Sequence, residues 1–374
     1  PYQMRGFMWM QALDRLHMGG ILADDMGLGK TLQVITLLLW AKRRGDQNAA
    51  SIVVAPTSLV YNWMGEIAKF APELRCAGEG TQAQRAQTIS RLTGENRDVD
   101  VYLTSYPLIR RDIGLLSKVS FRFAILDEAQ YIKNPGTQAA KGVKQITAGF
   151  KLALTGTPIE NRLSELWSIF DYLMPGFLYT YQRFREEIEI PIVVNGDENR
   201  MQRLQRMIRP FILRRLKGEV LRDLPAKLEE NVFAKLEGEQ LALYDAHVQR
   251  MKESLEGKSE KEFRSEKIQI LAELTRLRQI CCDPGLLFEG YKGESAKAQM
   301  CMELIENAVG AGHKVLLFSQ FTSMLERLAA GLKKAGIDYY MLTGSVGKEK
   351  RMQMVESFNE DDVPVFCISL KAGG

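Results

Sequence analysis

Residues 21–45, ILADDMGLGKTLQVITLLLWAKRRG, contain the side chains with the clearest potential for chemistry. Lys30 and Thr31 stand at the end of a glycine-bearing loop, between a short apolar run and an amphipathic stretch. Gly27 and Gly29 allow positive φ and a close approach of the backbone to a ligand. Free N–H groups at the start of the following helix attract anions. The pattern predicts a phosphate-binding loop, in which Lys30 reaches the terminal phosphates and Thr31 offers a hydroxyl to Mg²⁺.

One position of this loop departs from the general pattern, because Asp24 stands where the first glycine is expected. A glycine-rich turn before a core helix is the simpler interpretation, but it does not explain a lysine at the end of the loop. The residues expected to surround the nucleotide phosphates are Asp24, Asp25, Met26, Gly27, Leu28, Gly29, Lys30 and Thr31.

A second group of chemical interest is DEAQ, residues 127–130, which follows another apolar run. Asp127 is placed to hold Mg²⁺ directly or through water. Glu128 can orient or deprotonate the attacking water. Acidic pairs after strands are common, so the catalytic interpretation depends on the phosphate loop upstream. Gln3 could read an adenine edge with one donor and one acceptor, although a surface glutamine is the simpler interpretation of that residue alone.

Five short apolar runs are expected to position these groups, at residues 21–23, 51–56, 101–105, 123–128 and 151–156. They are nearly continuous rather than alternating, which suits strands buried on both faces of a parallel sheet. The helical segments between several of them cover residues 58–70, 81–93 and 106–117. This alternation predicts a doubly wound α/β domain. Each run ends in polar residues, so one continuous site is expected along the carboxyl edge of the sheet.

The composition sets limits on the class of protein. A chain of 374 residues suggests two domains, and its 45% apolar content is ordinary for globular proteins. The net charge of +4 permits nucleic-acid binding without arguing for it. Five cysteines without C-x-x-C spacing and only three histidines argue against zinc, and the cysteines are typical of core thiols. Apolar runs such as residues 34–41 are far too short to span a membrane.

Ten segments of the chain resemble, in order, the motifs of SWI/SNF-type ATPases, the chromatin-remodelling branch of helicase superfamily two. They are DDMGLGKT, VVAPTSLVYNW, LTSY, DEAQYIKN, LTGTPIEN, RPFILRRLKGEVLRDLPAK, LRQICCDP, VLLFSQF, LTGSVGKEKR and ISLKAGG. The resemblance covers essentially the whole chain. Two positions depart from it, because Gln130 and Asp283 stand where many relatives have histidine. We expect Gln130 to affect how the nucleotide site responds to DNA, and Asp283 to be structural.

The resemblance implies an α/β fold of two RecA-like parallel-sheet lobes with helical insertions, the second lobe being incomplete. The expected organisation is a first ATP-binding lobe (1–160), a helical insertion with a basic segment (161–222), a linker (223–235), a helical insertion of the second lobe (236–295) and a truncated second lobe (296–374). Helices are expected over 162–188 and 198–209, with a loop at 191–198, and over 237–281 with the polar joint GKSEKE. Because the chain starts at Pro1 without Met and stops at Gly374 inside a motif, we expect a fragment of a longer protein.

The resemblance also implies ATP, Mg²⁺ and double-stranded DNA as ligands, with Gln3 and Gln130 at the nucleotide. The residues that it places on DNA are Pro56, Thr57, Ser105, Tyr106, Asn161, Gln320 and Lys371. To these we add Arg203 and Arg206 from the strongest basic cluster, because Lys and Arg outnumber Asp and Glu nine to two over residues 200–227. A solvated helix face is the simpler interpretation of this cluster, and the resemblance offers a third, in which the adjoining RPFILRRLK braces the two lobes.

The expected function is ATP-driven translocation along double-stranded DNA that remodels protein–DNA complexes without separating the strands. Two alternatives stay open: an RNA helicase of the same superfamily, and a nucleotide-dependent DNA-binding scaffold that hydrolyses little ATP. The expected partners are duplex DNA and DNA-bound protein complexes, with no membrane and no zinc. DEAQ and the short insertions resemble bacterial members, which predicts a bacterial, nucleoid-associated cytoplasmic protein; a eukaryotic one would be nuclear.

Overall fold

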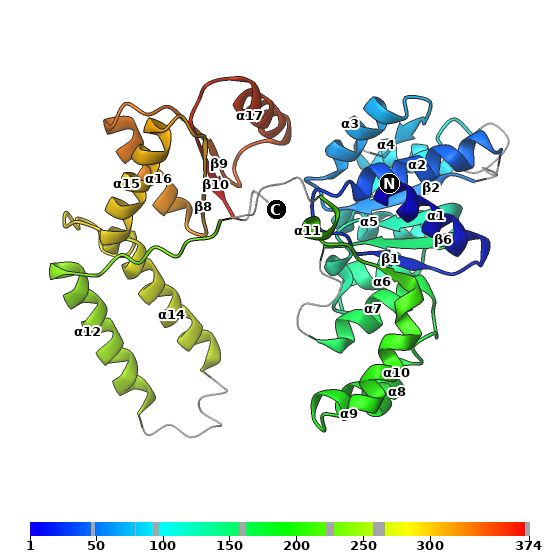
Figure 1. The fold of residues 1–374 in the computed structure, drawn as a ribbon, viewed down its shortest axis with the longest axis horizontal. Coiled ribbons are helices and arrows are strands. Elements are labelled where there is room, and N and C mark those ends of the chain that lie inside the picture. Colours follow the sequence, from blue (N-terminus) through cyan, green and yellow to red (C-terminus); the bar gives the residue numbers. More distant parts are fainter. Residues whose placement is uncertain are drawn as a thin grey trace. The chain divides into compact units, whose positions relative to one another are not determined.

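The chain folds into two compact units, Pro1–Ala226 and Lys227–Gly374, which are described separately (Figure 1). The structure, a computed structural model, describes residues 1–45, 49–78, 80–92, 97–156, 162–221, 228–256 and 266–370. Two predicted joints, DLPAK at 223–227 and GKSEKE at 257–262, lie outside the described residues. In the part of the chain that is described, no helix is long and apolar enough to cross a membrane.

The first unit is built on a seven-stranded sheet with the order β3-β4-β2-β5-β6-β1-β7. Its strands are β1 (Gly20–Leu22), β2 (Ser51–Ala55), β3 (Cys76–Ala77), β4 (Val101–Ser105), β5 (Ser120–Leu126), β6 (Thr147–Leu154) and β7 (Ile212–Leu213). Every pairing in it is parallel. The predicted parallel α/β sheet is therefore confirmed, with the two short edge strands β3 and β7 added to the five that the apolar runs predict.

Both faces of this sheet are buried, as the unbroken apolar runs predict. Successive residues of β2 enter opposite cores: Ile52 and Val54 belong to one hydrophobic cluster and Val53 to the other. The helices that cover the sheet are α1 (Tyr2–Arg15), α2 (Lys30–Arg43), α3 (Val60–Phe70), α4 (Gln82–Ser90), α5 (Tyr106–Leu116), α6 (Gln138–Lys144) and α7 (Leu163–Leu173). This two-sided burial holds the carboxyl ends of the strands, and the loops that follow them, in one fixed row.

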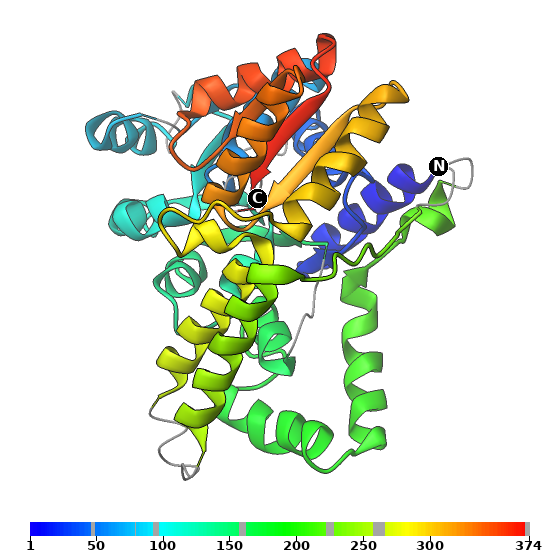
Figure 2. The same ribbon diagram turned by 90° about the vertical axis from the view of Figure 1, so that its left-hand side faces the viewer.

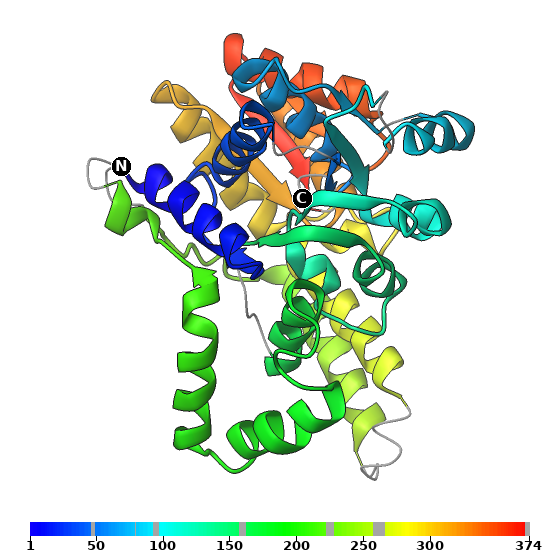
Figure 3. The ribbon, with the colours of Figure 1, turned by 90° about the vertical axis from the view of Figure 1, so that its right-hand side faces the viewer.

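The predicted helical insertion is largely helical but differs from the prediction at residues 191–198. Its helices are α7, α8 (Tyr181–Phe184), a π-helical turn (Arg185–Glu189), α9 (Ile190–Val193), α10 (Glu198–Ile208) and α11 (Lys217–Val220). The prediction of a loop over residues 191–198 is wrong at its start, because α9 includes Pro191, and proline is tolerated in the first turn of a helix. The chain after α10 returns to lie beside α1 (Figure 3) and supplies β7 to the sheet.

The second unit combines a helical pair with a smaller sheet. The helices α12 (Gly238–Leu255) and α14 (Lys267–Cys282) lie side by side (Figure 2). The sheet has the order β8-β10-β9, all parallel, with β8 (Val315–Ser319), β9 (Tyr339–Leu342) and β10 (Val365–Ser369). Its helices are α15 (Ala296–Gly310), α16 (Thr322–Lys334) and α17 (Lys348–Glu360). The second parallel sheet that the resemblance implies is confirmed.

Asp283 has the structural position that was expected of it. Its carboxylate accepts the N–H of Gly285 at 2.7 Å and lies 2.7 Å from Nε of Arg327 on α16. The Asp283 side chain is buried, and its ion pair with Arg327 connects the end of α14 to α16.

Candidate ATP site and nucleic-acid interface

The phosphate loop runs from the end of β1 to the first turn of α2. Gly27 and Gly29 have φ of 84° and 72°, in the region that favours glycine. Gly29 is the N-cap of α2, and the Lys30 ammonium donates to the carbonyl of Asp24 at 2.7 Å and to that of Asp25 at 3.4 Å. The lysine is therefore folded over its own loop, where a phosphate group would compete with two backbone carbonyls for its charge.

Helix α1 presses against the outer side of this loop. The Tyr2 hydroxyl donates to the Leu28 carbonyl at 3.1 Å, and the Gln3 amide approaches the same oxygen at 3.4 Å. A side chain at Gly29 would meet the Gln3 amide nitrogen at 2.5 Å. Gln3 thus lies beside the loop, as expected for a group that contacts the nucleotide, and the adenine contact itself stays a prediction.

The acidic pair lies at the carboxyl end of β5. Asp127 is only 7% exposed, and its carboxylate accepts hydrogen bonds from the Trp63 indole N–H at 2.8 Å and the Glu128 N–H at 2.9 Å. Burial raises the pKa of Asp127, and the nearby Lys30 ammonium acts in the opposite direction. A cation at this carboxylate would offset the cost of its burial.

Glu128 has a left-handed backbone conformation, with φ of 49°. Such a conformation is costly for a non-glycine residue and is concentrated at functional sites. The Gln130 amide donates to the Glu128 carboxylate at 2.6 Å, and the Gln130 carbonyl oxygen accepts from the Thr155 hydroxyl at 2.9 Å. Gln130 therefore connects Glu128 to the end of β6, and its predicted contact with the nucleotide stays a prediction.

These groups come from neighbouring strands. The sheet order places β5, β6 and β1 next to one another, so the acidic pair, Thr155 and the phosphate loop share one edge. For Mg²⁺ the donor set fits, because Thr31 and Asp127 offer the hard oxygen ligands that this ion prefers to combine with phosphate and water. In the described residues no cluster of three or more His, Cys, Asp or Glu side chains could hold a metal by itself.

Four of the residues of the first unit that were predicted to contact DNA are buried or half-buried. Pro56 is buried and Thr57 half-buried after β2, while Ser105 and Tyr106 are each 2% exposed. The Tyr106 hydroxyl donates to the Asp127 carbonyl at 2.7 Å. Tyr106 supports the acidic pair from inside the unit. The burial of Ser105 and Tyr106 weighs against direct DNA contact by these side chains. Asn161 and Lys371 lie outside the described residues.

The basic helix α10 does present charge to solvent. Arg203 and Arg206 are exposed, whereas Leu204 and Ile208 are buried on the inner side of the helix. Fewer residues of the basic cluster are free for DNA than the sequence suggests, because Arg215 forms an ion pair with Asp24 inside the unit. In the second unit Gln320 accepts a 2.6 Å hydrogen bond from Arg278 of α14, which fixes its amide after β8.

Two residues of this site were missed by the sequence predictions. Trp63 reaches Asp127, and Arg215 binds the Asp24 carboxylate through its Nε at 2.8 Å. Both stand inside quoted motifs, VVAPTSLVYNW and RPFILRRLK. A tryptophan in a helix after a strand is typical of core packing, and an arginine in a basic run is typical of a polyanion surface, so neither residue type indicates its contact.

Comparison with known proteins agrees with this geometry. The model of the SNF2-related domain matches residues 2–286, and that of the helicase conserved C-terminal domain matches residues 296–374. The chain belongs to the family of SNF2-related ATPases with a helicase C-terminal domain. As a member of this family, it is an ATP hydrolase.

Similar proteins come from all three domains of life. The Bacillus subtilis protein named "Putative ATP-dependent helicase/translocase YwqA" is 38% identical over all of this chain, which spans 41% of YwqA. The yeast TATA-binding protein-associated factor MOT1 is 31% identical over all of this chain, which spans 24% of MOT1. The solved SWI2/SNF2 ATPase core of Sulfolobus solfataricus in complex with double-stranded DNA is 37% identical, with a TM-score of 0.57 over 99% of this chain and 77% of that one.

Proposed function

We propose that this chain is the motor of an ATP-dependent double-stranded DNA translocase, which remodels protein–DNA complexes without separating the strands. The observation that carries the proposal is its likeness to the Sulfolobus ATPase core that was solved with double-stranded DNA, over nearly the whole chain. Because the chain spans 41% of YwqA, substrates and partners of the complete protein belong to the proposal.

The chemical step is assigned to the first unit. Lys30 exchanges its carbonyl partners for the β- and γ-phosphates and stabilises the charge that develops there. Mg²⁺, held by Thr31 and Asp127, supplies charge neutralisation when bound. Glu128 orients and activates the attacking water, and Gln130 fixes its carboxylate from Thr155.

DNA contact is assigned to phosphate groups rather than bases. Thr57, the exposed Arg203 and Arg206, and Gln320 are the described residues retained for it. Contacts of this kind give little sequence preference and a strong dependence on salt. We place the protein in a bacterial cytoplasm, associated with the nucleoid, on the strength of relatives such as YwqA.

The test compares ATP turnover of the complete natural protein with duplex DNA, single-stranded DNA and RNA of equal length. We expect duplex DNA to stimulate turnover most strongly. Stimulation by RNA alone would favour an RNA helicase. Tight duplex binding with no stimulated turnover would favour a nucleotide-dependent scaffold.

A further inference from the structure

The segment that follows the helical insertion is built into the phosphate loop. Strand β7 pairs with β1, and the pairing continues past the end of both strands. The Ala23 N–H donates to the Leu213 carbonyl at 2.7 Å, and the Asp25 N–H donates to that of Arg215 at 3.0 Å. The Lys217 N–H in turn donates to the Asp25 carboxylate at 2.9 Å. The segment thus follows the first residues of the loop itself.

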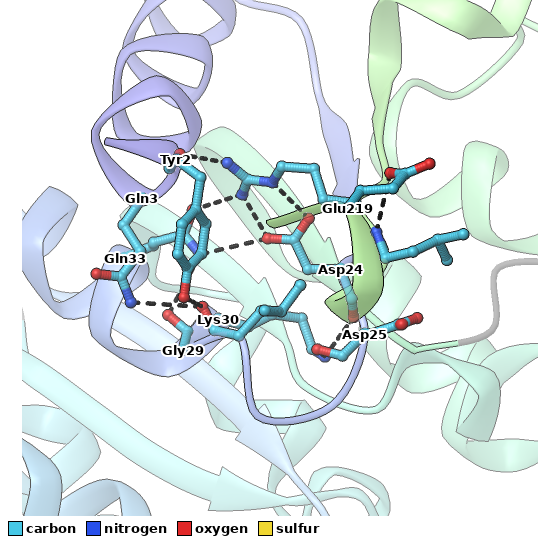
Figure 4. A network of polar contacts seen from close by, with 11 residues as sticks. Tyr2, Gln3, Asp24, Asp25, Gly29, Lys30, Gln33 and Glu219 are labelled. Atoms are coloured by element: carbon cyan, nitrogen blue, oxygen red, sulfur yellow. Dashed lines mark hydrogen bonds and ion pairs between the residues drawn. The ribbon is translucent and has the colours of Figure 1, made fainter. Parts of the chain in front are cut away.

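Arg215 is the centre of this contact, and its partners Tyr2, Asp24 and Gln33 are labelled in Figure 4. Its guanidinium binds both carboxylate oxygens of Asp24, with Nε to Oδ1 at 2.8 Å, and its Nη2 donates to Oε1 of Gln33 on α2 at 2.9 Å. Its Nη1 also donates to the Tyr2 carbonyl on α1. The Asp24 side chain is 0% exposed and that of Arg215 12%. The Arg215 guanidinium therefore connects the phosphate loop to both α1 and α2.

The contact reaches both ends of the loop. At the start of the loop, the Asp24 carbonyl accepts the Lys30 ammonium while the Asp24 carboxylate holds Arg215. At its end, the Gln33 amide donates to the Gly29 carbonyl at 3.3 Å and to Asp24 at 3.3 Å. Asp24 occupies the position where the general loop has glycine. A buried ion pair is by itself weak evidence for stability. The role of this pair is inferred instead from its contacts at both ends of the loop.

We propose that Arg215 is a positioning residue for ATP, which holds the phosphate loop in its nucleotide-binding shape through Asp24 and Gln33. This inference rests on the proposed ATP site and does not depend on the proposed DNA contacts.

The test separates positioning from simple support of the fold. Arg215→Gln leaves the buried Asp24 carboxylate without its cationic partner, so the Tm of this variant is expected to fall. The double variant Asp24→Asn/Arg215→Gln removes both charges with little change of shape, and we expect its Tm to return near the parental value. We expect its affinity for a fluorescent ATP analogue, in the complete protein, to stay weaker by about tenfold to a hundredfold, the range typical of losing an outer partner that orients a binding group.

Two further variants complete the design. Arg214→Gln changes the exposed neighbour and should bind the analogue like the parent. Arg215→Lys keeps the charge but not the planar fork that spans Asp24 and Gln33, and should raise KM with little change in Tm. Parental affinity in the stable double variant, or parental KM in Arg215→Lys, would overturn the proposal. Parental affinity in Lys30→Ala would instead show that the ATP site itself is misplaced.

Discussion

The indole N–H of Trp63 donates a hydrogen bond of 2.8 Å to Oδ2 of Asp127. Trp63 lies on α3 and is fully buried, so its ring cannot follow a carboxylate that rotates away. The other carboxylate oxygen accepts the Glu128 N–H. The side chain proposed to hold Mg²⁺ is thus fixed in one orientation by a residue outside the acidic motif.

Trp63→Phe should therefore loosen the orientation of the Asp127 carboxylate and weaken the binding of Mg²⁺. The change keeps the aromatic bulk and removes the only donor of the ring. We expect the Mg²⁺ concentration for half-maximal ATPase activity to rise about tenfold, the lower end of the effect of losing such an outer partner. Trp167→Phe is the matched control, because Trp167 also donates its N–H, to the Tyr179 carbonyl, but lies on α7. An equal Mg²⁺ requirement in both variants would contradict this positioning.

Lys30→Ala should abolish ATP hydrolysis in the complete protein. The ammonium is the charge placed to stabilise the β- and γ-phosphates as the bond breaks. The measurement is steady-state phosphate release with saturating duplex DNA. Turnover near the parental rate would mean that the phosphate-loop assignment is wrong.

Glu128→Gln should separate ATP binding from hydrolysis. The amide preserves the shape and can still meet Gln130, but it lacks the charge needed to activate water. We expect binding of Mg-ATP to persist while single-turnover hydrolysis falls by about a hundredfold or more. If binding falls in parallel with hydrolysis, Glu128 holds the site together and does not act on water.

The sequence was sufficient to predict the five central strands of the sheet and the glycine-bearing turn after β1. Short but nearly continuous apolar runs predicted these strands, because burial on both faces of a sheet requires them. The spacing of Gly27 and Gly29 predicted the turn. The two-residue strands β3 and β7 were missed, since so short a run carries no periodicity. Arg215 and Trp63 were missed because their contacts are made across the fold, by side chains that elsewhere serve surfaces or cores. The tyrosine of LTSY was expected on DNA, and its burial became visible only in the packed unit.

Arg203→Gln with Arg206→Gln should reduce DNA affinity about equally for all duplex sequences. If both guanidinium groups neutralise phosphates, the slope of log affinity against log salt should shrink by roughly 0.9 for each lost contact. Arg183→Gln is the control, because that exposed arginine of the same insertion is already paired with Glu187 at 2.8 Å. An unchanged slope with a lower Tm would assign the two arginines to the fold.

Asp100 should make the first unit sensitive to acid. Burial alone would raise the pKa of Asp100, but hydrogen bonds from Arg75 and Lys42 outweigh it and hold the pKa at about 2. The unfolded chain binds this proton near a pKa of about 3.9, so the stabilisation is complete above that pH and is lost as the pH falls towards 2. We expect Asp100→Asn to lower the free energy of unfolding by about 2 kcal/mol at pH 7. In urea titrations the difference from the parent should shrink below pH 4, and a constant difference would exclude the ion pairs as its source.

Displacement of a third DNA strand tests duplex translocation most directly. The complete protein is mixed with ATP and a duplex that carries a short triplex-forming strand at one end, and release of that strand is followed beside unwinding of a forked duplex. We predict ATP-dependent release of the third strand, lost in Lys30→Ala and Glu128→Gln, with the forked duplex left intact. Unwinding of the fork, or duplex-stimulated ATP hydrolysis without any release of the third strand, would contradict a double-stranded DNA translocase.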